Sequence, residues 1–240
     1  MPKEKTKTIP DSYYYDRRNK KWKNINKADE IPEKPDNKVL RKWLGEWERS
    51  TGYPEQEAAL EKLFTELLPT NTDLSDVLIK VCALNDFYST NIYDVFTVAK
   101  KIKEMNIDSE LFSDAPHPEL VNKLNNEVYE NSSPKRHIYS FATKYFSHHK
   151  PEMYPIYDSY VDKMLRYYRD KSDFGEVCPF NDKKLLDYEK FCSIVMKFKE
   201  FYQLEGTVKD IDKMLWQMGK YHFPKYIKPE KEANINTDTE

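Results

Sequence analysis

Asp158 is the residue whose type and surroundings most suggest chemistry in this chain of 240 residues. It lies in residues 154–161, where most neighbours are apolar or aromatic and where a carboxylate is costly to bury without a reason. A carboxylate fixed in such surroundings can stabilise developing positive charge or activate a water molecule. The same position is also typical of an ordinary helix N-cap, whose carboxylate accepts hydrogen bonds from free backbone N–H groups. The sequence leaves both roles open.

Two helices must position Asp158 if it has a chemical role. Residues 138–149 combine aromatic and small side chains and predict a buried helix, which a loop around Pro151 and Pro155 connects to a second helix opening at Asp158. Apolar residues spaced three and four apart predict further helices along the chain. Helices are expected to start at Asn37 and Tyr53, after N-caps at Asp73 and Asn91, and after Pro118. Two more are expected over 186–204 and 207–219.

The composition favours an all-α protein. Only 5 residues are Gly, helix-forming Lys, Glu and Leu are abundant, and 18 Tyr suggest a core in which Tyr packs with Phe, Leu and Ile. Aromatic residues around a polar turn near the N-terminus predict a small β-hairpin or an extended arm. We therefore expect a basic and aromatic arm over 1–36, an all-α domain over 37–228 and a disordered tail over 229–240.

Three segments carry a resemblance to a known family. An apolar helix over 78–85 runs into a polar turn and a second helix over 91–102. Later, Ala142 lies near the start of a helix that leads through a short loop to Asp158 and Ser159, which open the next helix. In this order and separation, residues 74–171 resemble the core of the helix-hairpin-helix DNA glycosylase superfamily, which includes endonuclease III and the adenine and 3-methyladenine glycosylases. The resemblance implies a helix-hairpin-helix glycosylase-like helical bundle.

The resemblance also implies base excision from DNA, with Asp158 as the catalytic carboxylate. Cleavage of the N-glycosidic bond builds positive charge on the deoxyribose, after the nucleotide has been flipped out of the stack. Bifunctional members carry a Schiff-base Lys about eighteen residues before the Asp. Here that position is Ser140, which can orient a water but cannot form an imine, and Lys144 one turn further along is the nearest amine. The expected enzyme is a monofunctional glycosylase with Asp158 and Ser140 as its catalytic residues.

The expected DNA contacts follow from the hairpin before this helix. In the family the hairpin is Gly-rich and binds a phosphate through backbone N–H groups and a cation, whereas residues 131–137 contain no Gly here. Residues 131–150 are nevertheless basic and contain no acidic residue. The residues expected to contact DNA are Lys135, Arg136, His137, Lys144 and Asn85. The residues expected to line the base pocket are Phe87, Tyr88 and Tyr157, although aromatic residues at helical spacing are also typical of a core.

Double-stranded DNA is therefore the expected partner, but a second function stays open. The net charge of −2 gives no overall nucleic-acid signal. The Gly-free hairpin and Ser140 also suit a non-catalytic DNA-binding or protein-interaction module on the same fold. If the chain is a glycosylase, its divergence points to an unusual altered base, such as a hypermodified phage base, in DNA repair or antiphage defence.

No cofactor, metal or membrane association is expected. The 3 Cys are far apart and lack a zinc-binding spacing, and the adjacent His148 and His149 point apart on a helix. No apolar stretch approaches the ~20 residues that span a bilayer. The first residues lack the apolar core of a signal peptide. We therefore expect a cytoplasmic protein with reduced thiols.

Overall fold

The computed structural model describes residues 13–16, 20–133 and 136–224, and this part of the chain is mostly helical, as the composition predicts. Its sheet is a two-stranded antiparallel hairpin. The strands and longer helices are β1 Tyr13–Asp16, β2 Lys21–Asn24, α1 Asn37–Glu48, α2 Tyr53–Lys62, α3 Leu74–Tyr88, α4 Val95–Met105, α6 Pro118–Glu127, α7 Tyr139–His149, α8 Ser159–Lys171, α10 Tyr188–Phe201 and α11 Val208–His222. The shorter helical segments are the 3-10 helices Ala28–Glu30 and Asp182–Leu186, the π-helix Leu63–Leu67, and the α-helices α5 Asp108–Leu111 and α9 Phe174–Val177.

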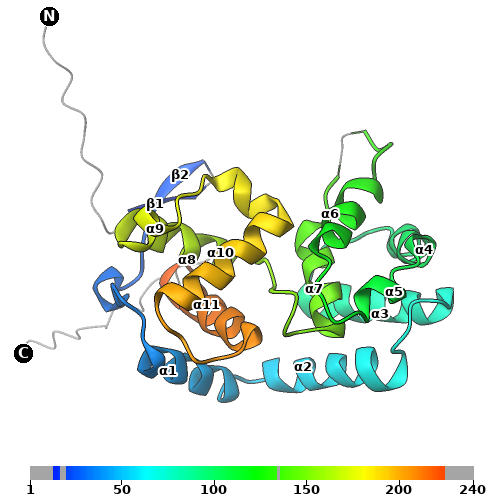
Figure 1. Ribbon diagram of the computed structural model, residues 1–240, viewed down its shortest axis with the longest axis horizontal. Coiled ribbons are helices and arrows are strands. Elements are labelled where there is room, and N and C mark those ends of the chain that lie inside the picture. The colour runs from blue at the N-terminus through cyan, green and yellow to red at the C-terminus, as the bar shows by residue number, and fades with distance from the viewer. Residues whose placement is uncertain (1–12, 17–19, 134–135, 225–240) are drawn as a thin grey trace, which may run out of the picture.

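The helices form two groups, with α2 lying along one edge of both (Figure 1). One group contains α3 to α7. The other contains α1, α8, α9, α10, α11 and the hairpin, and its closest packing joins α11 to α8 and to α1. Contacts of α2 with α1 on one side and with α3 and α7 on the other, together with contacts of α10 with α6, hold the two groups together. The C-terminal end of α3, the middle of α7 and the start of α8 are thereby brought next to α11.

Most helices begin where the sequence predicts. Asp73 caps α3 by accepting from the N–H groups of Ser75 and Asp76, and Asp158 caps α8 by accepting from Tyr160 N at 2.9 Å. The predicted Asn91 cap is wrong. Asn91 adopts a left-handed φ of 59° within a turn, and α4 begins only after Asp94, whose Oδ1 accepts from Thr97 N.

The N-terminal segment forms the hairpin rather than an extended arm. Tyr13 pairs with Asn24 and Asp16 with Lys21. The Tyr14 ring meets the Phe223 ring edge to face at 4.9 Å, and the backbone N–H of Asn26 donates to His222 O at 2.8 Å. The hairpin therefore packs on the C-terminal end of α11. Residues 1–12, 17–19 and the predicted tail lie outside the described residues.

The predicted Tyr-rich core is confirmed. Tyr145, Tyr154, Tyr168 and Tyr188 are each fully buried. Burial of a phenol requires a partner for its hydroxyl. Tyr188 accordingly donates to Pro155 O at 2.8 Å, and Tyr168 to Pro32 O at 3.1 Å. These bonds fix the loop before Asp158 to α10 and the entry of α1 to α8.

A buried lysine holds together the group formed by α3 to α7. The Lys80 side chain is inaccessible to solvent, and its Nζ donates to Thr70 O at 2.8 Å and to Asn71 Oδ1 at 2.7 Å. Its Nζ also lies 3.3 Å from His149 Nε2. Burial lowers the pKa of Lys80 to about 8.

This lysine predicts a pH dependence of stability. The folded pKa lies below the unfolded value, so between pH 8 and about 10.5 the unfolded chain binds more protons and stability rises with pH. We expect the free energy of unfolding of the wild type, relative to that of Lys80→Met, to increase by about 1 kcal/mol per pH unit in this window. Denaturant unfolding of both proteins from pH 7 to 10.5 measures it, and a constant difference would contradict the prediction.

Candidate functional site

A pocket of about 80 Å³ lies where the two helix groups meet. That space would hold several water molecules, since one needs about 10–15 Å³ on the same measure. Six long helices contribute to its wall. The lining residues are Trp47, Tyr53, Gln56, Glu57, Leu60, Phe87, Tyr88, Lys144, Ile156, Asp158, Val161, Lys209, Asp212, Lys213 and Trp216. The predicted residues Asp158, Lys144, Phe87 and Tyr88 are thus brought to one place.

Asp158 combines both roles that its sequence position left open. Its Oδ1 accepts from Tyr160 N and caps α8, while its Oδ2 lies 3.9 Å from the Nζ of Lys144. The side chain retains 22% of its exposure, so the carboxylate is reachable at the pocket wall. The cap fixes the orientation of the carboxylate, and the second oxygen is directed toward a cation.

Lys144 is a pocket residue rather than a surface cation. Its side chain is only 4% exposed. Its Nζ donates to Ser140 Oγ at 2.6 Å, and Ser140 O and Tyr157 O lie within 3.5 Å. The Nζ also lies 5.2 Å from the centre of the Tyr88 ring. Lys144 therefore lies beside Asp158 in the pocket and not on the surface, where the sequence analysis expects it to contact a DNA phosphate.

Ser140 anchors the segment that leads to Asp158. Its Oγ donates to Tyr157 O at 3.1 Å while accepting from Lys144, and Tyr157 N donates to Thr143 Oγ1 at 3.1 Å. Ser140 is not among the lining residues of the pocket. Its contacts make it a positioning residue, which holds the lysine and the backbone just before the catalytic candidate.

Aromatic rings form the walls of the pocket. Trp47 and Tyr53 stack with ring centres 5.8 Å apart, and Trp216 meets both edge to face. Tyr88 contributes from the end of α3, and its hydroxyl lies 3.0 Å from His148 Nε2. Phe87 is 38% exposed at the rim. A lining this rich in aromatic side chains suits an apolar or flat heterocyclic ligand.

Tyr157 and Asn85, like Ser140, lie outside this pocket, whereas Phe87, Tyr88, Lys144 and Asp158 line it. The Tyr157 ring packs against the rings of Tyr139 and Phe191, and its hydroxyl donates to Asp162. The Asn85 amide closes the turn after α3, accepting from Ile92 N and donating to Ile92 O. Tyr157 therefore belongs to the core, and Asn85 shapes a loop.

Three acidic groups meet in the pocket, two of which the sequence analysis missed. Glu57 pairs with Lys209 at 3.1 Å and with Lys213 at 2.7 Å, linking α2 to α11. Asp212 is fully buried, and its Oδ2 accepts from Ile156 N at 2.7 Å. A signal was present, because Asp212 falls four residues after Val208 and three before Leu215, within the apolar stripe of α11.

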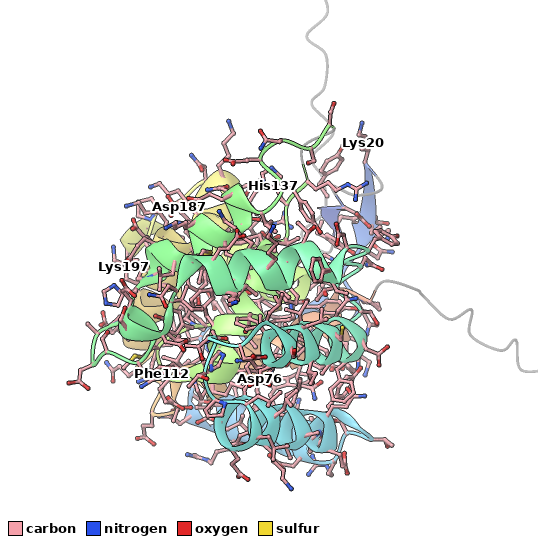
Figure 2. The ribbon with its side chains drawn as sticks, turned by 90° about the vertical axis from the view of Figure 1, so that its right-hand side faces the viewer. Lys20, Asp76, Phe112, His137, Asp187 and Lys197 are labelled. Carbon is pink, nitrogen blue, oxygen red and sulfur yellow. The ribbon has the colours of Figure 1, made fainter. Side chains whose placement is uncertain are left out.

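Two surface loops that do not line the pocket carry the remaining DNA-contact candidates. Arg136 and His137 are exposed, and Figure 2 shows His137 at the upper end of the molecule; Lys135 lies outside the described residues. The hydroxyl of Tyr129, near the start of this loop, donates to Asp94 O at 3.3 Å, so residues 128–133 begin beside the end of the loop 89–94. The second loop presents Tyr93, whose 88% exposure no residue pattern had indicated.

Metal-binding clusters and membrane-spanning helices are both absent from residues 13–16, 20–133 and 136–224. Within them, no group of three or more His, Cys, Asp or Glu side chains is arranged to hold a metal ion. Among the helices of the same ranges, none is both long and apolar enough to cross a bilayer.

Comparison with known proteins identifies a relative whose description names no activity. A family model described as HI_0787_N, N-terminal domain, matches residues 39–153. A protein of Haemophilus influenzae described as uncharacterized is 37% identical over 156 residues, which make up 65% of this chain and 72% of that protein. No solved structure matches the chain. The region matched by the family model includes Trp47, Tyr88 and Lys144 of the pocket and ends before Asp158.

Proposed function

We propose that this chain, which belongs to the same family as the Haemophilus influenzae protein, is a DNA glycosylase that removes an altered base in the pocket beside Asp158. The single observation that carries the proposal is the pairing of Asp158 with Lys144 in a pocket walled by aromatic rings. A base flipped from DNA needs flat apolar walls, and the sugar left behind needs a nearby carboxylate as it gains positive charge.

Asp158 supplies that carboxylate. Its cap bond to Tyr160 N fixes Oδ1, which leaves Oδ2 to face the reacting sugar or a water. A fixed negative charge stabilises an oxocarbenium-like transition state more than the neutral ground state. This role requires the charge of Asp158, whereas capping requires only an acceptor oxygen.

The surroundings of Lys144 support excision without a lyase step. An ammonium group has three N–H donors and no lone pair. Around the Nζ of Lys144 stand three oxygens of Ser140 and Tyr157, with Asp158 Oδ2 beyond them. An amine held as a donor in this way is not a nucleophile. Lys144 therefore orients Ser140 and Asp158. Hydrolysis breaks the bond between C1′ of the sugar and the base nitrogen, water supplies the hydroxyl group to C1′, and the proton lost by that water ends on the departing base.

Tyr93 and the loop 128–138 form the proposed DNA-binding surface. Arg136 and His137, together with Lys135, offer phosphate contacts. Tyr93, 88% exposed in the turn that follows the pocket residues Phe87 and Tyr88, is the side chain that we propose stacks in the gap left by a flipped nucleotide.

Tyr93→Ala is expected to weaken binding to double-stranded DNA about tenfold or more, since stacking on an aromatic ring contributes about 1–3 kcal/mol per base. Fluorescence anisotropy at fixed salt measures this. Folding should be unchanged because the side chain is 88% exposed. Phe112→Ala is the control, because Phe112 is an aromatic side chain that is 40% exposed and lies well below His137 in Figure 2. Equal losses in both variants would argue against the surface.

Base release from DNA tests the proposed activity. The purified chain is incubated with plasmid DNA, with DNA carrying alkylated, oxidised or deaminated bases, and with modified phage genomes. We expect alkali-sensitive abasic sites in at least one of these DNAs, and no covalent complex after borohydride, since Lys144 forms no imine. Salt-sensitive DNA binding without base release from any of them would instead favour the non-catalytic binding module.

A further inference from the structure

Two of the unpaired polar atoms in the buried part of the structure belong to pocket residues. Among the described residues, the buried side-chain atoms without a hydrogen-bond partner are Trp47 Nε1, Ser147 Oγ, His149 Nδ1 and Asp212 Oδ1. Trp47 and Asp212 line the pocket, and both side chains are more than nine-tenths buried. An unsatisfied buried polar atom costs about 1–3 kcal/mol, so a donor and an acceptor left unpaired in two residues of the same pocket require an explanation.

Among the described residues, no cation forms an ion pair with Asp212, and the nearby lysines are engaged elsewhere. Glu57 holds both Lys209 and Lys213, and Lys144 is occupied by Ser140, Tyr157 and Asp158. The charged or titratable groups that act on Asp212, or on which it acts, are Lys209 on its own helix, Lys144 on α7, Glu152 in the following loop, Tyr88 on α3, and Tyr188 and Cys192 on α10. Burial raises the pKa of Asp212 to about 7.

We propose that Asp212 selects the base that the pocket binds: its Oδ1 accepts a hydrogen bond from a ring or exocyclic N–H of a nitrogen heterocycle lying among the aromatic rings. Trp47 Nε1 donates to an acceptor of the same ligand. The proposal rests on the proposed function only in taking the ligand to be a nucleobase. Its physical basis is that a ligand lacking the N–H leaves the carboxylate oxygen unpaired. Buried polar sites reject such ligands more strongly than ligands that differ only in apolar groups.

Nucleobases that differ only by methylation of a single nitrogen test the hydrogen bond directly. The pairs are 9-methylhypoxanthine with 1,9-dimethylhypoxanthine, 1-methyluracil with 1,3-dimethyluracil, and 9-methyladenine with N6,N6,9-trimethyladenine, in all of which the nitrogen that joins the sugar in DNA is already methylated. Binding to the full chain is followed by tryptophan fluorescence, since Trp47 and Trp216 line the pocket, and by calorimetry. We expect the wild type to bind the N–H member of at least one pair about 10- to 100-fold more tightly, the range for a hydrogen bond to a charged group.

Asp212→Asn separates hydrogen bonding from steric exclusion. Asn keeps an oxygen to accept from Ile156 N, so the structural bond is retained, and it places an NH₂ donor where Oδ1 stands. The N–H preference should therefore disappear or reverse in the variant, whereas exclusion of the methyl group by size would persist. Glu189→Gln, an equal charge change at an exposed position on α10, is expected to keep the wild-type preference.

A measurement on the wild type alone covers the case in which Asp212→Asn does not fold. Because the carboxylate is the accepting form, affinity for the preferred N–H base should fall as the pH is lowered through about 7, while affinity for its methylated partner changes little. The inference is overturned if no free base binds at millimolar concentration, if both members of every pair bind equally, or if the preference survives in Asp212→Asn. Base binding with an N–H preference but without excision from any DNA supports Asp212 and overturns the glycosylase.

Discussion

Asp158→Asn should lower the rate of base release by on the order of 10³-fold, while leaving the chain folded. Removing a positioned acid, base or charge-stabilising group costs about 10²- to 10⁴-fold. The amide oxygen of Asn can still accept from Tyr160 N, so the cap of α8 is preserved. What is lost is the negative charge that faces Lys144 and the developing cation. Single-turnover assays of alkali-sensitive sites, with thermal unfolding of both proteins, measure the two effects separately.

Asp73→Asn provides the matched control for this experiment. Asp73 caps α3 by accepting from Ser75 N and Asp76 N, as Asp158 caps α8, but it does not line the pocket. The control should keep full activity and a similar unfolding temperature. If Asp158→Asn retains base release while binding the same DNA, Asp158 is only a helix cap and the chemistry lies elsewhere.

The parts of the site that the sequence predicts are local in the chain. Asp158, the α7 helix and the loop between them lie within about twenty residues, and their order is visible as a pattern of apolar spacing, prolines and a capping acid. The starts of α3 and α8 follow for the same reason, because a cap depends on residues two or three positions away. Helix existence and the position of Asp158 are therefore accessible without a structure.

The remainder of the site depends on contacts between distant segments. Trp47, Glu57 and Asp212 come from three helices that meet only after packing, and Glu57 pairs with lysines about 150 residues later in the chain. The direction of a side chain around a helix also decides its role. Lys144 and Tyr157 are both near Asp158 in sequence, yet Lys144 faces the pocket and the Tyr157 ring packs on Phe191. Composition gives no information on either point.

Helix α8 packs closely on α11 at Gly219. This contact affects both the stability of the chain and the position of the pocket residue Asp158. A Cβ at this position would lie 2.6 Å from Tyr160 O, 2.7 Å from Tyr160 Cβ and 2.8 Å from Tyr160 C. Two of these are backbone atoms of α8 and cannot rotate away. The N–H of Tyr160 also donates to the Asp158 carboxylate, two residues earlier in the chain. Any displacement of α8 at Tyr160 therefore also moves Asp158.

Gly219→Ala is therefore expected to destabilise the chain and to lower base release together. Alanine gains about 1 kcal/mol in helix propensity, whereas forcing α8 away costs about 1–3 kcal/mol, so the strain prevails. A shift of about 1 Å at a catalytic group lowers the rate about 10²-fold. Gly45→Ala in α1 is the control, because its Cβ meets only the flexible end of Arg49 at 3.4 Å and the propensity gain should remain. Denaturant unfolding and single-turnover assays follow both variants, and an active, stabilised Gly219→Ala would mean that α8 is not held in place by α11.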